Sequence, residues 1–73
     1  MRPVRRVPVE STSVKSVGYD PDTGTMEVEF VSGAVYEYLG VPPKVHRELV
    51  GAESIGGYFT QYVRDRYFTQ KVG

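Results

Sequence analysis

The chain has 73 residues, enough for one domain and close to the lower limit at which a single apolar core holds a protein together. It has no cysteine, which excludes disulfide bonds and thiolate metal sites, and its nine basic and nine acidic side chains cancel. Because its longest apolar runs are only two or three residues, we expect neither a membrane span nor a secretory signal, and we expect a cytoplasmic protein.

The charges are distributed unevenly along the chain. Residues 1–9 contain three arginines and no acid, whereas residues 10–38 contain six acids and one lysine. From residue 59 onward the balance is positive again, through Arg64, Arg66 and Lys71. An anion-binding surface is therefore expected at the ends of the chain.

The two ends are predicted to flank one domain. Pro3 and Pro8 disfavour a helix near the N-terminus, so residues 1–9 are predicted to form a flexible basic arm in which Val7 and Val9 are placed to join the edge of a sheet. Residues 10–68 are predicted to form the single domain, and residues 69–73 a C-terminal tail.

A hairpin is predicted over residues 16–30, with a four-residue loop at Pro21-Asp22-Thr23-Gly24. Placing Asp20 opposite Thr25 pairs Tyr19 with Met26 and Val17 with Val28. One face of the hairpin is then apolar and the other polar, as a half-buried antiparallel sheet requires. Val14 fits this register only if the strand has a bulge or starts after it.

A second hairpin is predicted to turn at Val31-Ser32-Gly33. A two-residue loop would place Val28 opposite Glu37, whereas a three-residue loop with a left-handed Gly33 places Val28 opposite Tyr36. We choose the second, which also makes Glu27 face Glu37 on the outside and destabilises the sheet unless a cation or a partner lies there. The predicted core face consists of Val17, Tyr19, Met26, Val28, Phe30, Tyr36 and Tyr38.

Two helices are predicted to follow. Pro43 suits the first position of a helix whose apolar side is Val45, Leu49 and Ala52. Ser54 is the expected cap of a second helix, whose apolar side chains are Tyr58, Phe59, Tyr62 and Val63. The fold class is therefore α+β, a three-stranded antiparallel β-meander followed by two short helices packed on one face.

Gly56 and Gly57 weaken the first turn of this second helix, at about 1 kcal/mol each relative to alanine. Two reasons for them stay open. One is close backbone packing, and the other is the close approach of a phosphate to exposed amides at a helix start.

The ordered set of motifs along both hairpins and the second helix resembles the KTSC family, a small domain named after the C-terminus of some lysyl-tRNA synthetases and also found alone in short bacterial and phage proteins. The resemblance covers roughly residues 8–67, and its central signature is Tyr36-Glu37-Tyr38. It implies no established activity, and it implies RNA binding only through the synthetase connection. Of the residues that carry it, we expect five mainly in the core or in structural roles: Tyr36, Tyr38, Phe59, Gly56 and Ser54.

Signatures of catalysis are absent from the sequence. His46, the only histidine, lacks the partner at i, i+4 that a zinc site on one helix face needs, and we expect it on the protein surface. There is no Gly-x-Ser-x-Gly elbow, and Asp20 and Asp22 are explained by local hydrogen bonds in a turn. We therefore expect a protein that is not an enzyme and that has no cofactor, no metal and no small-molecule substrate.

A binding module is the preferred interpretation. Residues 58–68 interleave aromatic side chains with arginines, a composition typical of single-stranded nucleic-acid sites, in which rings stack on bases and arginines hold phosphates. RNA, either tRNA or a single strand, is the first expected partner. Its hypothetical site consists of Arg64, Arg66, Tyr67, Tyr58, Lys71 and Arg47.

Two other interpretations stay open. Phe59, Tyr62 and Val63 would simply belong to the core, and Arg64 and Arg66 would form ion pairs with acids such as Glu37 or Asp65. The alternative function is a protein-protein interaction or self-association module, acting through the open edges of the sheet and the face that carries Val35 and Leu39.

Overall fold

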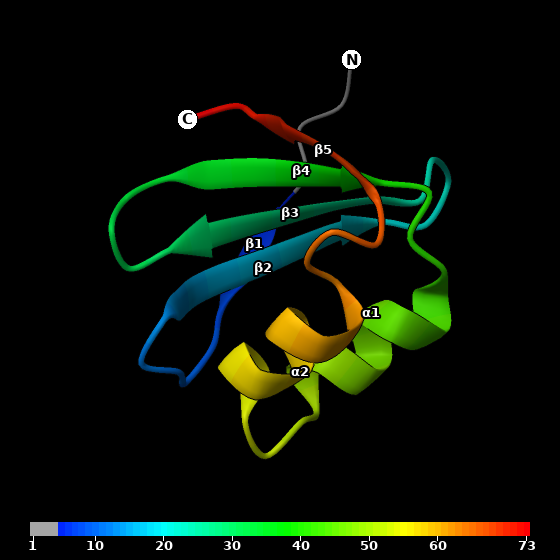
Figure 1. The fold of residues 1–73 in the computed structure, drawn as a ribbon. Coiled ribbons are helices and arrows are strands. Elements are labelled where there is room, and N and C mark those ends of the chain that lie inside the picture. Colours follow the sequence, from blue (N-terminus) through cyan, green and yellow to red (C-terminus); the bar gives the residue numbers. More distant parts are fainter. Residues whose placement is uncertain (1–4) are drawn as a thin grey trace.

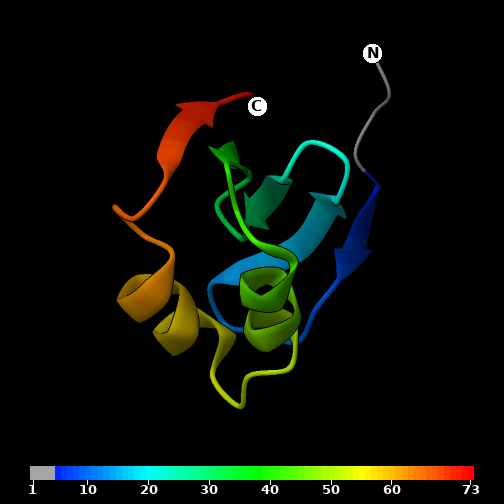
Figure 2. The same cartoon turned by 90° about the vertical axis from the view of Figure 1, so that its right-hand side faces the viewer.

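The computed structural model describes residues 5–73 and shows an antiparallel sheet covered on one face by two helices (Figure 1). Its five strands lie side by side in chain order. Figure 2 shows both helices on the same side of the sheet, with the first and last strands at opposite edges. The elements are β1 (Arg6–Pro8), β2 (Val14–Asp20), β3 (Thr25–Phe30), β4 (Val35–Leu39), α1 (Pro43–Val50), α2 (Ile55–Tyr62) and β5 (Phe68–Lys71).

The α+β class is as predicted, but the prediction of three strands is wrong, because β1 and β5 extend the meander on both sides. Every residue of these two strands is exposed. Their sequences therefore lack the alternation of apolar and polar residues that marks a half-buried strand. The two segments are recognised as strands only by their main-chain hydrogen bonds to β2 and β4.

Both predicted flanking segments contribute to the sheet. Residues 1–4 of the predicted flexible arm lie outside the described residues, whereas Arg6–Pro8 forms β1. Val7 pairs with Val17, and the Val9 amide donates to the Lys15 carbonyl at 3.1 Å. The predicted tail continues along β4 in place of hanging free, since the Val72 amide donates to the Val35 carbonyl at 2.8 Å.

The predicted registers of both hairpins are confirmed. Val17 pairs with Val28 and Val28 with Tyr36, so all three side chains lie on the face beneath the helices. A register shift between Val14 and Ser16 shows that, of the two alternatives for Val14, the strand has a bulge. Gly33 has a φ of 97°, the left-handed conformation that the three-residue loop requires.

The core lies between this face of the sheet and the helices. Of the seven residues predicted for the core face, Val17, Met26, Val28 and Tyr38 are buried, and Tyr19, Phe30 and Tyr36 are partly buried against them. The helical side and its connections contribute the buried side chains of Val41, Leu49, Ile55, Phe59 and Val63. The Ser54 hydroxyl accepts from the Gly57 amide at 3.1 Å, which confirms the predicted helix cap.

On the open face of the sheet, Glu27 faces Glu37 as predicted. One side chain from each edge strand reduces the repulsion between these two carboxylates. The Arg6 guanidinium donates to the Glu27 carboxylate and lies 3.9 Å from Glu29, while the Gln70 amide donates to Glu37 at 2.9 Å. No helix in the described part of the chain is long and apolar enough to cross a membrane.

Candidate functional site

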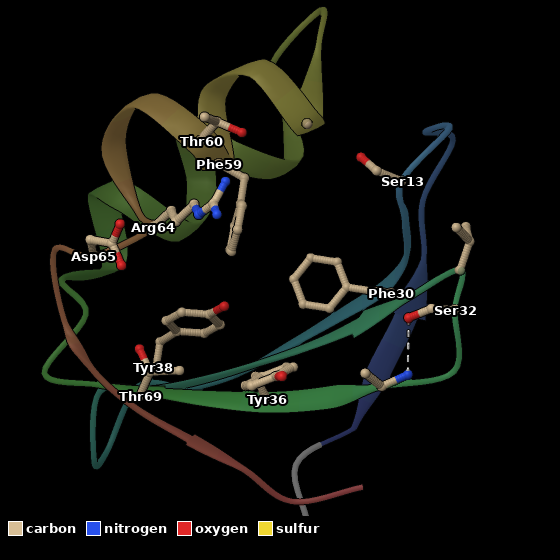
Figure 3. Close-up of a pocket in the computed structure, with 13 residues that line it drawn as sticks. Ser13, Phe30, Ser32, Tyr36, Tyr38, Phe59, Thr60, Arg64, Asp65 and Thr69 are labelled. Carbon is tan, nitrogen blue, oxygen red and sulfur yellow. Dashed lines mark hydrogen bonds between the residues drawn. The ribbon is translucent and has the colours of Figure 1, made fainter.

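A groove of about 620 Å³ lies between helix α2 and the helix-covered face of strands β3 and β4 (Figure 3). The groove remains because the sheet is broad, while α1 and α2 have only eight residues each and leave part of its face uncovered. Its lining comes from five separate parts of the chain: Ser13, Phe30, Val31, Ser32, Ala34, Tyr36, Tyr38, Gly56, Phe59, Thr60, Arg64, Asp65 and Thr69.

Aromatic rings form the middle of the groove. Phe30 packs edge to face against Phe59, with centroids 5.3 Å apart, and against Tyr36 at 5.9 Å. Phe59 makes a third such contact with Tyr38, at 5.4 Å and an interplanar angle of 82°. These mutual contacts hold the rings in fixed orientations, so the groove has a preformed apolar wall.

Polar groups lie at both ends of the groove. Figure 3 shows Arg64 and Asp65 at one end and the hydroxyls of Ser13 and Ser32 at the other. Within residues 5–73, the Arg64 guanidinium has neither a hydrogen bond nor an ion pair with another side chain. A cation without a protein partner, beside an apolar wall, is suited to an anion or to a ligand that carries acceptors.

Tyr38 is the most buried polar side chain of the groove. Burial, together with the neighbouring Tyr36 phenol and Asp65, raises the pKa of the Tyr38 phenol to about 12, although the Arg64 cation acts in the opposite direction. The Tyr38 hydroxyl therefore stays protonated at neutral pH and is available as a hydrogen-bond donor.

Asp65 enters the groove because of the way α2 ends. After Val63 the chain turns sharply, with the Arg64 amide bonded to the Phe59 carbonyl at 2.8 Å and the Arg66 amide bonded to the Val63 carbonyl at 3.0 Å. Asp65 lies between them at a φ of 62°, the only non-glycine residue with positive φ among the described residues. Aspartate tolerates this conformation better than most side chains do.

The structure places the six predicted RNA-contacting residues in different surroundings. Arg64 lines the groove, and Lys71 lies opposite Tyr36 on β5 and so on the same face of the sheet. Arg66 is exposed and donates to the Gln61 carbonyl at 3.4 Å, and Arg47 is exposed on α1. The half-buried Tyr58 and Tyr67 pack against the core. The six residues are not brought together into one surface.

The five residues of the family signature have structural positions. Tyr38 and Phe59 are buried, Tyr36 is partly buried, and Ser54 caps α2. A Cβ atom added to Gly56 would lie 2.7 Å from the Ser13 hydroxyl oxygen, which supports close packing as the reason for this glycine.

His46 is not the isolated surface side chain that was predicted. Its ring stacks on Tyr19 with centroids 4.7 Å apart and planes 9° apart, and it is half-buried. Burial, and next the Arg47 cation, lower the pKa of His46. The described residues contain no cluster of histidine, aspartate or glutamate suited to a metal ion.

Sequence reasoning missed most of the groove. It assigned Phe30 to the core and Asp65 to the role of a counter-ion, and it gave no role to Ser13, Thr60 or Thr69. Nothing in the local sequence marks these positions, because only the fold brings them together.

The sequence profile described as the KTSC domain matches residues 10–67. The chain belongs to the KTSC domain family. A KTSC domain protein from Yersinia pestis has a crystal structure with a TM-score of 0.94 and 35% sequence identity to this chain, over 97% of this chain and 100% of that one.

Two kinds of relative share the KTSC domain. An uncharacterized protein of Stutzerimonas stutzeri is 43% identical over 65 residues, which are 89% of this chain and 92% of that protein. A lysine–tRNA ligase of Nostoc punctiforme is 38% identical over 58 residues, which are 80% of this chain and 10% of that enzyme. The domain is thus found both as nearly a whole protein and as a small part of a large one.

Proposed function

We propose that this KTSC domain is a non-catalytic module that binds RNA, either tRNA or a single strand, in the groove between α2 and strands β3 and β4. The observation that carries the proposal is the Arg64 guanidinium, which has no side-chain partner among residues 5–73 and lies beside a wall of aromatic rings. Relatives that are lysine–tRNA ligases by name act on tRNA, which makes RNA the first candidate among anionic ligands.

In the proposed complex, one RNA base stacks on the aromatic wall of the groove, and the positive charge of Arg64 lies beside that base. Stacking of one base on an aromatic side chain contributes about 1–3 kcal/mol and tolerates any base. Arg64 inside the groove and Lys71 on the neighbouring strand supply the charge for the strand. Because the protein has no net charge, affinity depends on these local groups and not on a long-range field.

The module is proposed to be non-catalytic because of the surroundings of its hydroxyl groups. In the described part of the chain, no serine or threonine that lines the groove is hydrogen-bonded to a histidine or a carboxylate that would act as a general base. We accordingly propose no cofactor, and a cytoplasmic location, where tRNA is found.

The test is fluorescence anisotropy with a labelled tRNA and a labelled single-stranded RNA. If the protein neutralises two or three phosphates of a single-stranded RNA, we expect its affinity to fall about 7- to 18-fold when the salt concentration is raised from about 50 to about 200 mM. We expect Arg64→Gln to weaken binding about tenfold. Arg66→Gln is the matched control, because Arg66 is two residues away, exposed and outside the groove.

The proposal is wrong if the wild-type protein binds neither RNA at tens of micromolar. Equal losses in the Arg64→Gln and Arg66→Gln variants would contradict the groove as the site while leaving RNA binding in place.

A second candidate function is association with another protein or with a second copy through a sheet edge. It is favoured by β5, an edge strand whose residues are all exposed, and by Phe68, whose side chain is 68% exposed. Of the face considered for such contacts, Val35 is buried and so unavailable. Sedimentation that is concentration-dependent and insensitive to salt would support this candidate, and Phe68→Ser should abolish it.

A further inference from the structure

We infer that the groove selects a guanine base. This inference rests on the proposed RNA-binding function and specifies which nucleotide occupies the site. Three features carry it: the aromatic wall, the adjacent cation and carboxylate at one end, and the space available.

The wall and the volume fit one planar base with its sugar. Phe30 and Phe59 are fixed at 76° to each other, so a flat ligand can stack on one ring while the edge of the other ring contacts it. A volume of about 620 Å³ lies within the range of about 300–1,000 Å³ typical of small-ligand pockets. The groove therefore has room for one nucleotide.

Arg64 and Asp65 distinguish guanine from the other bases. Guanine has two acceptors, O6 and N7, next to two donors, N1–H and the N2 amino group. Arginine donates to the first pair and a carboxylate accepts from the second. Adenine has an amino group in place of O6, so its donor would face the donors of the Arg64 guanidinium and no hydrogen bond would form there. A phosphate would use only the Arg64 guanidinium, whereas guanine uses both the guanidinium and the Asp65 carboxylate.

The backbone at Asp65 supports a defined role for this carboxylate. Asp65 has a φ of 62°, a conformation that aspartate adopts more readily than most side chains, and the turn fixed by the Arg66 amide holds it there. Figure 3 shows Arg64 and Asp65 at the same end of the groove. At the opposite end, the hydroxyls of Ser13 and Ser32 are available to the sugar and phosphate.

The experiment compares short uridine oligonucleotides that carry one central guanosine, inosine or adenosine, and it includes free GMP and AMP. Inosine retains O6, N7 and N1–H but lacks the N2 amino group. We expect guanosine to bind at least about fivefold more tightly than adenosine, the lower limit of one bidentate base contact, with inosine in between.

The decisive variant is Asp65→Asn, because asparagine also tolerates a positive φ but carries no charge. We expect it to remove the preference for guanosine over inosine and to leave binding of an all-uridine oligonucleotide unchanged. Glu53→Gln is the control, since Glu53 is exposed and does not line the groove. The NMR chemical shifts of the protein's backbone amides, recorded during each titration, report folding and binding in the same samples.

The possible outcomes separate this inference from the proposed function. Equal affinity for all the oligonucleotides would overturn guanine selection and leave RNA binding intact. Binding of GMP over AMP without binding of any oligonucleotide would support guanine selection with a free nucleotide as the ligand and would overturn the RNA proposal. Absence of all binding would overturn both.

Discussion

The rings of Tyr19 and His46 lie parallel, 9° apart, with their centroids separated by 4.7 Å. The Tyr19 hydroxyl in turn donates to the Val41 carbonyl at 2.5 Å, so the pair joins β2, the connection after β4 and helix α1. Burial and the Arg47 cation both disfavour a charge on this imidazole, and the folded protein therefore holds His46 in its neutral form.

Stability should therefore fall as His46 becomes protonated in the unfolded chain. The pKa of His46 is lowered in the folded state from an ordinary value of 6.5. Above about pH 6.5 both states are neutral, and below it the unfolded chain binds the proton first. We expect the urea midpoint of the wild type to fall between pH 7.5 and pH 5.5 relative to His46→Phe, which keeps a stacking ring. Parallel pH profiles of the two proteins would disprove this.

The Tyr58 hydroxyl donates to the Glu48 carboxylate at 2.8 Å and ties α2 to α1. Burial of the ring, and next this hydrogen bond, raise the pKa of Tyr58 to about 12. We expect Tyr58→Phe to lower the free energy of unfolding by about 1 kcal/mol. Tyr62→Phe is the matched control, because the Tyr62 ring contacts Tyr58 but is 50% exposed. If the bond matters, Tyr58→Phe will have little effect in a Glu48→Ala background, where the acceptor is absent.

Gly56 and Ser13 are predicted to be coupled. Alanine at position 56 gains about 1 kcal/mol of helix propensity, but its Cβ would lie 2.7 Å from the Ser13 hydroxyl oxygen. We expect Gly56→Ala alone to be close to neutral and to be stabilising by about 1 kcal/mol in a Ser13→Ala background. Thermal unfolding of the four proteins of this cycle measures the coupling, and strict additivity would show that the contact carries no energy.

Arg6 should stabilise the sheet through the acids of its open face. Its side chain is 33% exposed and those of Glu27 and Glu29 are 14% and 21% exposed, so the pairs are only partly screened by solvent. We expect Arg6→Gln to cost about 0.5–1 kcal/mol of unfolding free energy and to cost less at high salt. Arg5→Gln serves as the control for the loss of one charge. Adding Glu27→Gln should restore stability to the Arg6→Gln variant by removing the repulsion with Glu37.

The hairpins were predictable because each register has a local determinant. Alternation fixes the face on which Val17 and Val28 lie, and Gly33 fixes the loop that places Tyr36 opposite Val28. Strand β5 was not predictable, because its residues are all exposed and its pairing with β4 depends on where two helices end.

The groove was not predictable for a different reason. Its aromatic residues also pack on the core, and a period-two pattern cannot tell a buried ring from one that lines an opening. Arg64 was selected for its charge, but its proposed role depends on its having no side-chain partner among residues 5–73, which only the three-dimensional structure shows. The sequence indicates that Asp65 is a counter-ion of the neighbouring arginines, whereas in the structure it lines the groove from a turn at a φ of 62°.

The order of the strands in the sheet also determines how the protein opens. Pairings from β1 through β4 join neighbours in the chain, whereas both helices lie between β4 and β5 in the sequence. An edge strand with no buried side chain opens locally more readily than a central strand, because little apolar contact holds it. Strand β5 carries Thr69, which lines the groove, and Lys71, which lies beside it. We therefore expect amide hydrogen exchange to be faster along β5, on this side of the groove, than along the central strands β2, β3 and β4.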